Sequence, residues 1–286
     1  MKFRRSGRLV DMTNYLLHHP HSLVPLTHFS EKYQSAKSSI SEDLTIIKET
    51  FEQQGIGTLL TVPGAAGGVK FIPKVAISEA KQFIEELCEF IAKPERLLPG
   101  GYLYLTDILG TPSIVNKIGR LFATVFSNRK IDVVMTVATK GIPLAYAVAA
   151  QLDVPVVIVR KDSKVTEGST VSINYVSGSS KRIQTMLLAK RSLKEGSNVL
   201  IIDDFMKAGG TINGMVSLLE EFKAKVAGIG VLVETEGVEE RLVDQYVSLV
   251  KLADVDVRER NIQVTDGSYF QIVNEEKIGE DLNENS

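Results

Sequence analysis

The chain has 286 residues, of which 44% are hydrophobic and 24% charged, an ordinary composition for a globular protein that buries a core. No apolar run reaches the roughly 18 residues that span a bilayer, and the N-terminus lacks the apolar stretch of a signal peptide, so we expect a cytoplasmic protein with no membrane partner. A single cysteine, Cys88, excludes an intrachain disulfide and a cysteine-rich zinc site.

Charge and histidine are unevenly distributed along the chain. The first 74 residues hold nine Lys and Arg against six Asp and Glu, whereas the remainder holds 24 against 29. All four histidines lie in the first segment, from His18 to His28. The longer remainder therefore cannot run chemistry that needs a histidine base or a Cys–His pair. We expect a first domain over residues 1–75, a second over 76–275, and a disordered acidic tail over 276–286.

The first segment predicts three helices followed by a hairpin. Helical spacing ends near Pro20, a second short helix covers about residues 26–33, and a third runs over about residues 36–54. Ser39 with Glu42 three residues later suits a capping box for the third helix, although the serines upstream could cap it instead. Two short strands then flank a glycine-rich tip at residues 64–68. The predicted apolar stripe of the third helix is Ile40, Leu44, Ile47 and Phe51.

Three helices and a hairpin resemble the winged helix-turn-helix, in which the third helix lies in the major groove of double-stranded DNA and the hairpin, or wing, touches its backbone. Basic side chains in this segment could neutralise phosphates, and small hydroxyls could donate hydrogen bonds. The alternative is a small helical packing domain with a solvated basic tail, and Glu42 and Asp43 oppose phosphate binding. The candidate DNA-binding residues are Arg4, Arg5, Arg8, Lys37, Ser38, Ser39, Ser41 and Lys70.

The second segment alternates between helices and apolar strands. An amphipathic helix over residues 76–92 opens it, and strands are predicted around residues 131–138, 154–161, 198–204 and 226–237. Apolar strands separated by helices predict an α/β domain with a mostly parallel sheet and helices on both faces. Ligands bind such sheets outside the carboxyl ends of the strands. Three loops meet that condition.

The first of these loops belongs to the stretch VLIIDDFMKAGGT at residues 199–211. Two neighbouring carboxylates at a strand end can accept hydrogen bonds from vicinal hydroxyls such as those of ribose. The glycines let a backbone approach closely, and the helix that follows offers unpaired N–H groups to a phosphate. The alternative is an ordinary strand–loop–helix connection with solvated acids, which a bare Gly-Gly-Thr would favour but the full pattern does not.

This pattern resembles the phosphoribosyl pyrophosphate signature of the type I phosphoribosyltransferases. The resemblance implies that Asp203 and Asp204 hold the ribose hydroxyls and that residues 207–211 hold the 5′-phosphate. One departure is Ala208, where the family commonly has threonine, so one side-chain contact to phosphate is missing. The candidate effector-binding residues in this stretch are Asp203, Asp204, Phe205, Met206, Lys207, Ala208, Gly209, Gly210 and Thr211.

Two further loops resemble parts of the same family. Residues 138–141 follow a predicted strand and match the pyrophosphate loop, and residues 160–182 match a flexible loop that closes over pyrophosphate. The Ser, Thr and Gly content of the latter and its lack of an apolar period predict a mobile segment of about twenty residues, longer than most structural connections. The candidate residues are Ala138, Thr139, Lys140, Gly141, Arg160 and Lys161.

The ligand implied by the resemblance, phosphoribosyl pyrophosphate, carries several negative charges, so we expect Mg²⁺ to bind with it. The ligand's own oxygens could coordinate the ion, and no protein ligand is assigned. A hood region selects the base in the transferases, and here Tyr102 and Tyr104 could stack on a purine. The slightly favoured interpretation is that both tyrosines are ordinary core or rim aromatics, and Tyr102 remains a candidate effector-binding residue.

Two functions from different classes fit these patterns: a purine phosphoribosyltransferase, whose chemistry needs no histidine, and a sensor whose first domain binds DNA. The order of domains favours the second, because it resembles the purine operon repressor family of Gram-positive bacteria over essentially the whole chain. That resemblance implies a non-enzymatic homodimer that represses purine synthesis and transport genes and is released from operator DNA by phosphoribosyl pyrophosphate. A purine nucleotide with several phosphates could compete for the same loops.

Overall fold

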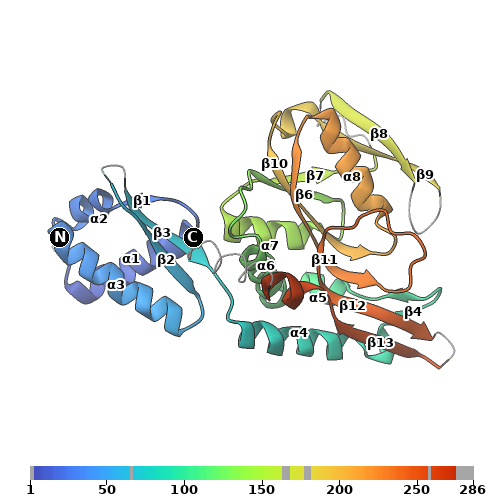
Figure 1. The fold of residues 1–286 in the computed structure, drawn as a ribbon, viewed down its shortest axis with the longest axis horizontal. Helices are drawn as coiled ribbons and strands as arrows, with labels where there is room; N and C mark the ends of the chain where they lie inside the picture. The colour runs from blue at the N-terminus through green and yellow to red at the C-terminus, as the bar shows by residue number, and fades with distance from the viewer. Residues whose placement is uncertain (1–2, 65–66, 163–167, 177–181, 257–258, 275–286) are drawn as a thin grey trace, which may run out of the picture. The chain divides into compact units, whose positions relative to one another are not determined.

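The computed structural model describes residues 3–64, 67–162, 168–176, 182–256 and 259–274 (Figure 1). These residues form two compact units, one made of residues 1–79 with 151–153 and the other of residues 80–150 with 154–286. The tail that we expect to be disordered, residues 276–286, lies outside the described residues, as do two residues of the predicted wing tip, Ala65 and Ala66.

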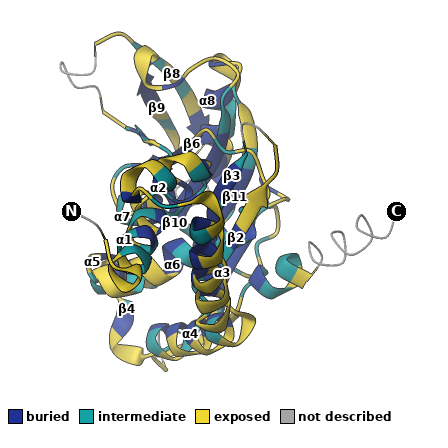
Figure 2. Cartoon of the chain, turned by 90° about the vertical axis from the view of Figure 1, so that its left-hand side faces the viewer, coloured by how far each residue is buried: buried dark blue, intermediate teal, exposed yellow. Residues whose placement is uncertain are grey.

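The first unit contains three helices and a three-stranded antiparallel sheet of order β1-β3-β2. The apolar stripe predicted for the third helix is confirmed, because Ile40, Leu44, Ile47 and Phe51 are all at most 5% exposed. Figure 2 shows this helix with one buried and one exposed face. The elements are α1 (Arg5–His18), β1 (Val24–Pro25), α2 (Leu26–Tyr33), α3 (Lys37–Gln53), β2 (Gly57–Val62) and β3 (Gly68–Pro73).

The capping box predicted for the third helix is wrong. Helix α3 begins at Lys37, so Ser39 lies inside its first turn, and Ala36 at the N-cap position makes no side-chain hydrogen bond. The serine just upstream does not cap either, since the Ser35 hydroxyl accepts a 2.9 Å hydrogen bond from Arg8 Nη1 and donates to the Tyr33 carbonyl. A contact with α1 therefore takes up the hydroxyl that could otherwise have capped the helix.

The second unit is built on a six-stranded sheet of order β13-β12-β11-β10-β6-β7, parallel except for the β12–β13 pair. Its helices are α4 (Ile77–Ile91), α5 (Thr106–Gly110), α6 (Pro112–Val125), α7 (Ile142–Leu152) and α8 (Gly210–Glu221). Its strands are β4 (Leu97–Leu98), β5 (Tyr102–Leu103), β6 (Val133–Val137), β7 (Val156–Val159), β8 (Thr170–Val176), β9 (Ile183–Ala189), β10 (Asn198–Met206), β11 (Lys225–Thr235), β12 (Val247–Asp256) and β13 (Asn261–Asp266).

Helices cover both faces of the sheet. On one face Phe122 of α6 and Phe126, its C-cap residue, pack so closely over Gly230 and Gly228 of β11 that a Cβ on either glycine would lie less than 3.0 Å from a ring carbon. On the other face, α8 packs onto the apolar side chains of β6, β7, β10 and β11 (Figure 1). No helix in the described part of the chain is both long and apolar enough to cross a membrane.

The segment predicted to be mobile, residues 160–182, contains a strand in its described part, which sequence analysis did not predict. Strands β8 and β9 pair antiparallel from Thr170 opposite Ala189 to Val176 opposite Ile183. Burial explains the order: Tyr175 is 7% exposed and packs against Gly214 of α8, where a Cβ would lie 2.9 Å from its ring. Residues 163–167 and 177–181 of this segment lie outside the described residues.

Candidate functional site

The two adjacent carboxylates lie near the carboxyl end of β10, a central strand paired in parallel with β11 and β6. Asp203 is only 3% exposed, while Asp204 is half-buried. The backbone N–H of Asp204 donates a 3.0 Å hydrogen bond to Asp203 Oδ1. The position at a strand end agrees with the prediction, but Asp203 is buried rather than solvated, so the pair is unlike a surface acid cluster.

Burial raises the pKa of Asp203 well above the ordinary value of an aspartate, and the charge of Asp204 raises it further. Burial also raises the pKa of Asp204, while its hydrogen bond with Asp203 and the charge of Lys140 oppose that rise. Lys161 opposes the rise at Asp203. Two carboxyls held together in a buried position disfavour their own ionisation, an arrangement that is common at functional sites.

Replacing Asp203 by asparagine is therefore expected to stabilise the effector-free protein at neutral pH. Because the folded-state pKa of Asp203 is raised, the wild-type chain loses stability as the pH rises from the unfolded value near 4 through the folded value, and the variant lacks this contribution. We expect a gain of about 1 kcal/mol at pH 7, typical of relaxing a functional site. Denaturant unfolding between pH 4 and 8 measures this gain, and a gain that fails to grow with pH would contradict the explanation.

The phosphate loop, residues 207–211, connects β10 to α8. Gly209 has a φ of +80° and occupies the N-cap position, so the turn into the helix uses a backbone conformation that favours glycine. Helix α8 begins at Gly210, and its first turn contains no acidic residue. Its first backbone N–H groups and the positive end of its dipole are therefore directed to the carboxyl end of the sheet, where they can bind an anion.

The second predicted loop, residues 138–141, passes directly beside the acid pair. Gly141 is buried, and a Cβ there would lie 2.1 Å from Thr136 Oγ1 and 3.2 Å from Asp203 Oδ1. Close backbone approach therefore requires glycine at this position. Of this loop, Lys140 lines the same cavity as Asp204, whereas Ala138, Thr139 and Gly141 do not.

The third predicted loop contributes less to the cavity. Arg160 exchanges two backbone hydrogen bonds with Leu187 of β9, at 3.0 and 2.9 Å, which ties the β8–β9 hairpin to the end of β7. Lys161 is exposed, and it acts on Asp203 by its charge. Neither Arg160 nor Lys161 lines the cavity in this structure.

A cavity of about 520 Å³ joins Asp204 to the phosphate loop, a size suited to a small-molecule ligand. Sequence reasoning missed its far wall, which comes from the ends of β11 and β12. The carboxyl-end rule for parallel sheets could have indicated that wall, had β12 been predicted. The missed residues include Thr235, Glu236, Leu252, Ala253, Asp254 and Val255, and the predicted residues that line the cavity are Tyr102, Lys140, Asp204, Phe205, Met206, Lys207, Ala208, Gly209, Gly210 and Thr211.

Tyr102 lies on the short β4–β5 hairpin and is 69% exposed, so it is a rim residue of the cavity rather than a core aromatic. The base of this hairpin is fixed by Arg96, which is 5% exposed. Its guanidinium binds the Asp107 carboxylate at 2.9 and 2.6 Å, donates to the Tyr104 carbonyl at 2.7 Å, and lies 3.8 Å from the ring centre of Phe90. The exposed ring of Tyr102 is therefore carried on an anchored hairpin.

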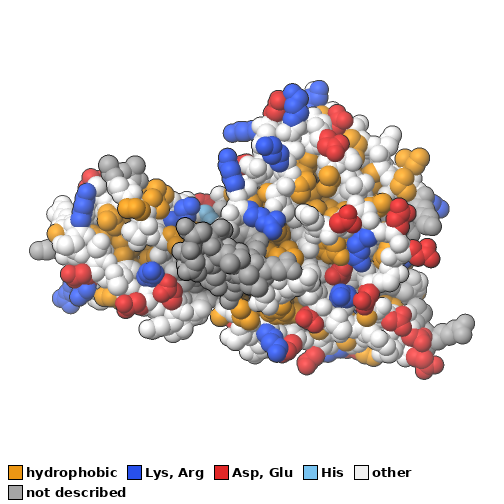
Figure 3. All heavy atoms as spheres, in the orientation of Figure 1, with side chains coloured by type: hydrophobic (Ala, Val, Ile, Leu, Met, Phe, Trp, Pro, Cys, Tyr) orange, Lys and Arg blue, Asp and Glu red, His pale blue; other side chains and the backbone are white. Residues whose placement is uncertain are grey.

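In the first unit, the start of α3 presents Lys37, Ser38 and Ser41 as exposed side chains, with Ser39 half-buried. Arg4 is exposed and Lys70 is half-buried. On the face of this unit seen in Figure 3, basic side chains are interspersed with acidic ones. The exposed start of α3 is the part of the unit best suited to enter a groove of DNA.

Arg5 and Arg8 lie elsewhere and bind Asp43 of α3. The Nε atoms of Arg5 and Arg8 are 2.9 and 2.5 Å from the two Asp43 oxygens, and Asp43 is fully buried. The Arg8 side chain is 11% exposed, so its guanidinium is occupied inside the unit, whereas that of Arg5 is 55% exposed. Asp43, which the sequence suggested would oppose phosphate binding, is neutralised inside the fold.

These features define a class of protein in which a winged-helix unit accompanies a phosphoribosyltransferase-type α/β unit. Residues 4–73 match the family described as bacterial purine repressor, N-terminal, and residues 105–266 match the phosphoribosyl transferase domain. The chain is 74% identical over 271 residues, 95% of each chain, to the purine biosynthesis transcriptional repressor PurR of Bacillus subtilis (strain 168). The chain belongs to the family of bacterial purine biosynthesis transcriptional regulators, which confirms the predicted family and fold class.

Other relatives extend this comparison. A purine biosynthesis transcriptional activator of Lactococcus lactis (strain IL1403) is 51% identical over 267 residues, covering 93% of this chain and 98% of the relative. The xanthine phosphoribosyltransferase of the same strain is 33% identical over 146 residues, half of this chain and 74% of the enzyme. The adenine phosphoribosyltransferase of Thermoanaerobacter pseudethanolicus shares the fold, with a TM-score of 0.52 and 24% identity over 59% of this chain and 99% of that one.

Proposed function

We propose that the protein is a repressor of purine biosynthesis and transport genes that binds operator DNA as a homodimer and is released by phosphoribosyl pyrophosphate. The observation that carries this proposal is the single cavity in which Asp204 and the phosphate loop meet, with Asp203 buried beside them. Hydroxyl acceptors and anion donors side by side suit a phosphorylated ribose. The repressor role is chosen over activation because the relative at 74% identity is named a repressor, although relatives at 51% are named activators.

The effector would bring Mg²⁺ with it. The described residues contain no group of three or more His, Cys, Asp or Glu side chains that could hold a metal ion. Magnesium commonly binds through one or two carboxylates together with ligand phosphates and water. No protein ligand is assigned, and the ion would be held mainly by oxygens of the effector. Such a regulator would act in the cytoplasm, where its DNA and its effector meet.

Release from DNA follows from linkage between two sites. The effector must bind the free conformation better than the DNA-bound one, and DNA must then weaken effector binding by the same factor. A coupling of about 1–3 kcal/mol is typical, about 5- to 150-fold in affinity. We infer that the chain acts through binding rather than catalysis, because Ala208 removes a hydroxyl from the phosphate loop and its near full-length relatives are named regulators.

The test is a gel shift on a control region of a purine gene at fixed salt, with Mg²⁺ and increasing phosphoribosyl pyrophosphate. Loss of the shifted band supports the proposal, and a band that persists at saturating effector contradicts it. No shift at any protein concentration would favour a purine phosphoribosyltransferase, measured by nucleotide formation from each purine base. Displacement of labelled phosphoribosyl pyrophosphate by purine nucleotides tests the proposed competition, and no displacement at millimolar concentrations would exclude it.

Lys37 is expected to contact a DNA phosphate because it is exposed at the start of α3. Lys37→Ala should weaken operator binding at all sequences alike and lower the slope of log affinity against log salt by about one. The matched control is Lys223→Ala in the second unit, which removes one exposed lysine paired with Glu195. Fluorescence anisotropy at several salt concentrations measures both slopes, and equal slopes for Lys37→Ala and the parent would exclude the contact.

A further inference from the structure

The β11–β12 loop, residues 236–246, contacts the phosphate loop at two consecutive positions. The backbone N–H of Leu242 donates a 2.9 Å hydrogen bond to the Ala208 carbonyl. The next residue, Val243, is 8% exposed and packs against Gly209, where a Cβ would lie 3.0 Å from the valine Cγ2. The turn that begins α8 is therefore held by hydrogen bonding at one residue and by packing at the next.

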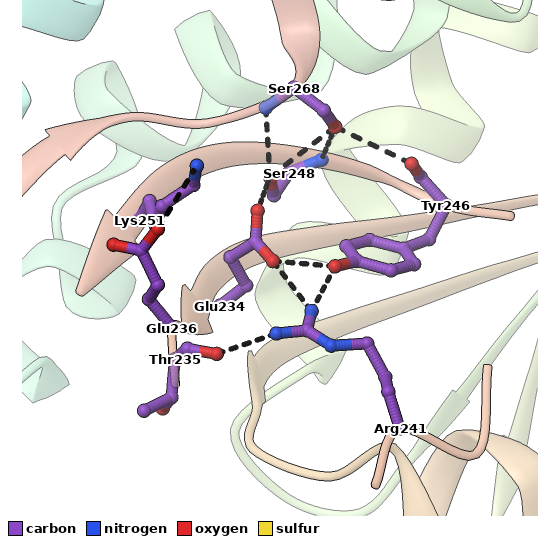
Figure 4. A network of polar contacts seen from close by, with 8 residues as sticks. All are labelled: Glu234, Thr235, Glu236, Arg241, Tyr246, Ser248, Lys251 and Ser268. Carbon is purple, nitrogen blue, oxygen red and sulfur yellow. Dashed lines mark hydrogen bonds and ion pairs between the residues drawn. The ribbon is translucent and has the colours of Figure 1, made fainter. Parts of the chain in front are cut away.

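Arg241, the residue directly before these two contacts, anchors the β11–β12 loop to β11 (Figure 4). Its Nη1 lies 2.6 Å from Glu234 Oε2, and its Nη2 donates to the Thr235 carbonyl at 2.7 Å. Glu234 is 5% exposed near the end of β11. Its Cα pairs with that of Met206, the residue just before the phosphate loop. The guanidinium therefore ties the β11–β12 loop to β11, the strand beside β10, which carries the acid pair.

Glu234 also accepts hydrogen bonds from β12 and from the end of the β11–β12 loop. The Tyr246 hydroxyl donates to Oε2 at 2.5 Å and the Ser248 hydroxyl to Oε1 at 2.6 Å. Ser248 in turn exchanges hydrogen bonds with Ser268, since each backbone N–H lies 3.0 Å from the other hydroxyl. Figure 4 shows Arg241, Tyr246 and Ser248 converging on the carboxylate of Glu234, with Ser268 behind Ser248.

The ion pair is strongly held although it is buried. Burial alone raises the pKa of Glu234, but the hydrogen bonds from Ser248, Tyr246 and Arg241 outweigh it and lower the pKa overall. Removing one partner of such a pair leaves the other charge poorly compensated. Neither Glu234 nor Arg241 lines the cavity, so their effect on a ligand is indirect, through the phosphate loop or through the neighbouring cavity residues Thr235 and Glu236.

We propose that residues 236–246 form a brace that holds the phosphate loop in its binding conformation, and that Arg241 positions the brace. This inference rests on the proposed function, because it assigns the 5′-phosphate of phosphoribosyl pyrophosphate to that loop. Backbone N–H groups bind a phosphate only when they converge on it. Without the brace, Gly209 and its neighbours sample other conformations, and the effector must order them on binding, which lowers its affinity.

Two measurements on Arg241→Ala test the brace. Hydrogen exchange of the backbone amides at residues 205–213 reports on the loop without any ligand, and calorimetry with Mg²⁺ reports the Kd of phosphoribosyl pyrophosphate. We expect faster exchange confined to this segment and to residues 234–246, and a rise in Kd of about tenfold, with operator affinity unchanged. Arg241→Lys, which keeps the charge but loses the forked geometry, should show smaller changes in both exchange and Kd than Arg241→Ala. Lys223→Ala, which breaks an exposed ion pair, is the control and should change neither.

Unchanged exchange and unchanged Kd in a folded Arg241→Ala would overturn the proposal. If that variant instead loosens the whole second unit, Val243→Ala decides, because it removes the packing against Gly209 and leaves the ion pair in place. Faster exchange at residues 205–213 alone then supports the brace, and parental exchange rejects it. If the parent chain binds no phosphoribosyl pyrophosphate, the proposed function fails, while the exchange data still decide whether the brace holds the loop.

Discussion

Replacing Asp203 and Asp204 together by alanine is expected to abolish release of operator DNA by phosphoribosyl pyrophosphate, while operator affinity without effector stays within about twofold of the parent. The pair is the only group of acids that the motif places against the phosphate loop, and one member lines the cavity while the other is buried beside it. In the proposed binding mode, the ribose hydroxyls lose their acceptors without these carboxylates. Buried charge-assisted hydrogen bonds contribute about 1.5–3 kcal/mol each, so effector affinity should fall by more than 100-fold.

The same variant should fold at least as well as the parent, because it removes two carboxyls whose burial opposes ionisation. A suitable control is Glu220→Ala with Glu221→Ala, which removes an adjacent pair of acids from the exposed end of α8. Calorimetry measures effector binding, and anisotropy with labelled operator measures release. A folded double variant that no longer binds operator at all would show that the acid pair serves the DNA-binding state, and the sensor interpretation would be wrong.

Local periodicity predicted most elements that carry the site. The strand before Asp203, the helix after Gly209 and the helices of the first unit are all close to their predicted ranges, because each has a short-range apolar period and a glycine or proline boundary. The acid pair and the phosphate loop could be assigned for the same reason. All of that information lies within one continuous stretch of sequence, residues 199–211.

Features that depend on long-range pairing could not be predicted in this way. Alternation of Val171, Ile173 and Tyr175 along β8 could have indicated a strand, but its pairing with β9 and the packing of Tyr175 on α8 are seen only in the structure. The brace depends on Glu234 and Arg241, which nothing in the sequence connects to residues 208 and 209. Asp43 looked like an obstacle to DNA binding because its partners, Arg5 and Arg8, lie more than 30 residues away.

Asp43→Ala is expected to remove operator binding and leave effector binding intact, the reverse of the change at Asp203 and Asp204. Asp43 is fully buried on α3, and Arg8, whose side chain is 11% exposed, would lose its counter-charge. Breaking a buried ion pair from one side costs about 3–5 kcal/mol, a large share of the stability of a unit this small. Because the salt bridge ties α1 to α3, its loss should release the helix that presents Lys37 and Ser38.

Glu42→Ala is the matched control on the same helix, because Glu42 is 71% exposed and only 3.7 Å from Arg5. It should change stability by less than about 1 kcal/mol and should leave operator affinity equal or higher, since it removes a negative charge near phosphate. Calorimetric unfolding should show the first unit melting earlier in Asp43→Ala while the transition of the second unit stays in place. If Asp43→Ala kept parental operator affinity, operator binding would not depend on the buried ion pair of Arg8 with Asp43. Of the two arginines, Arg5 has the exposed guanidinium and would then be the one able to reach DNA.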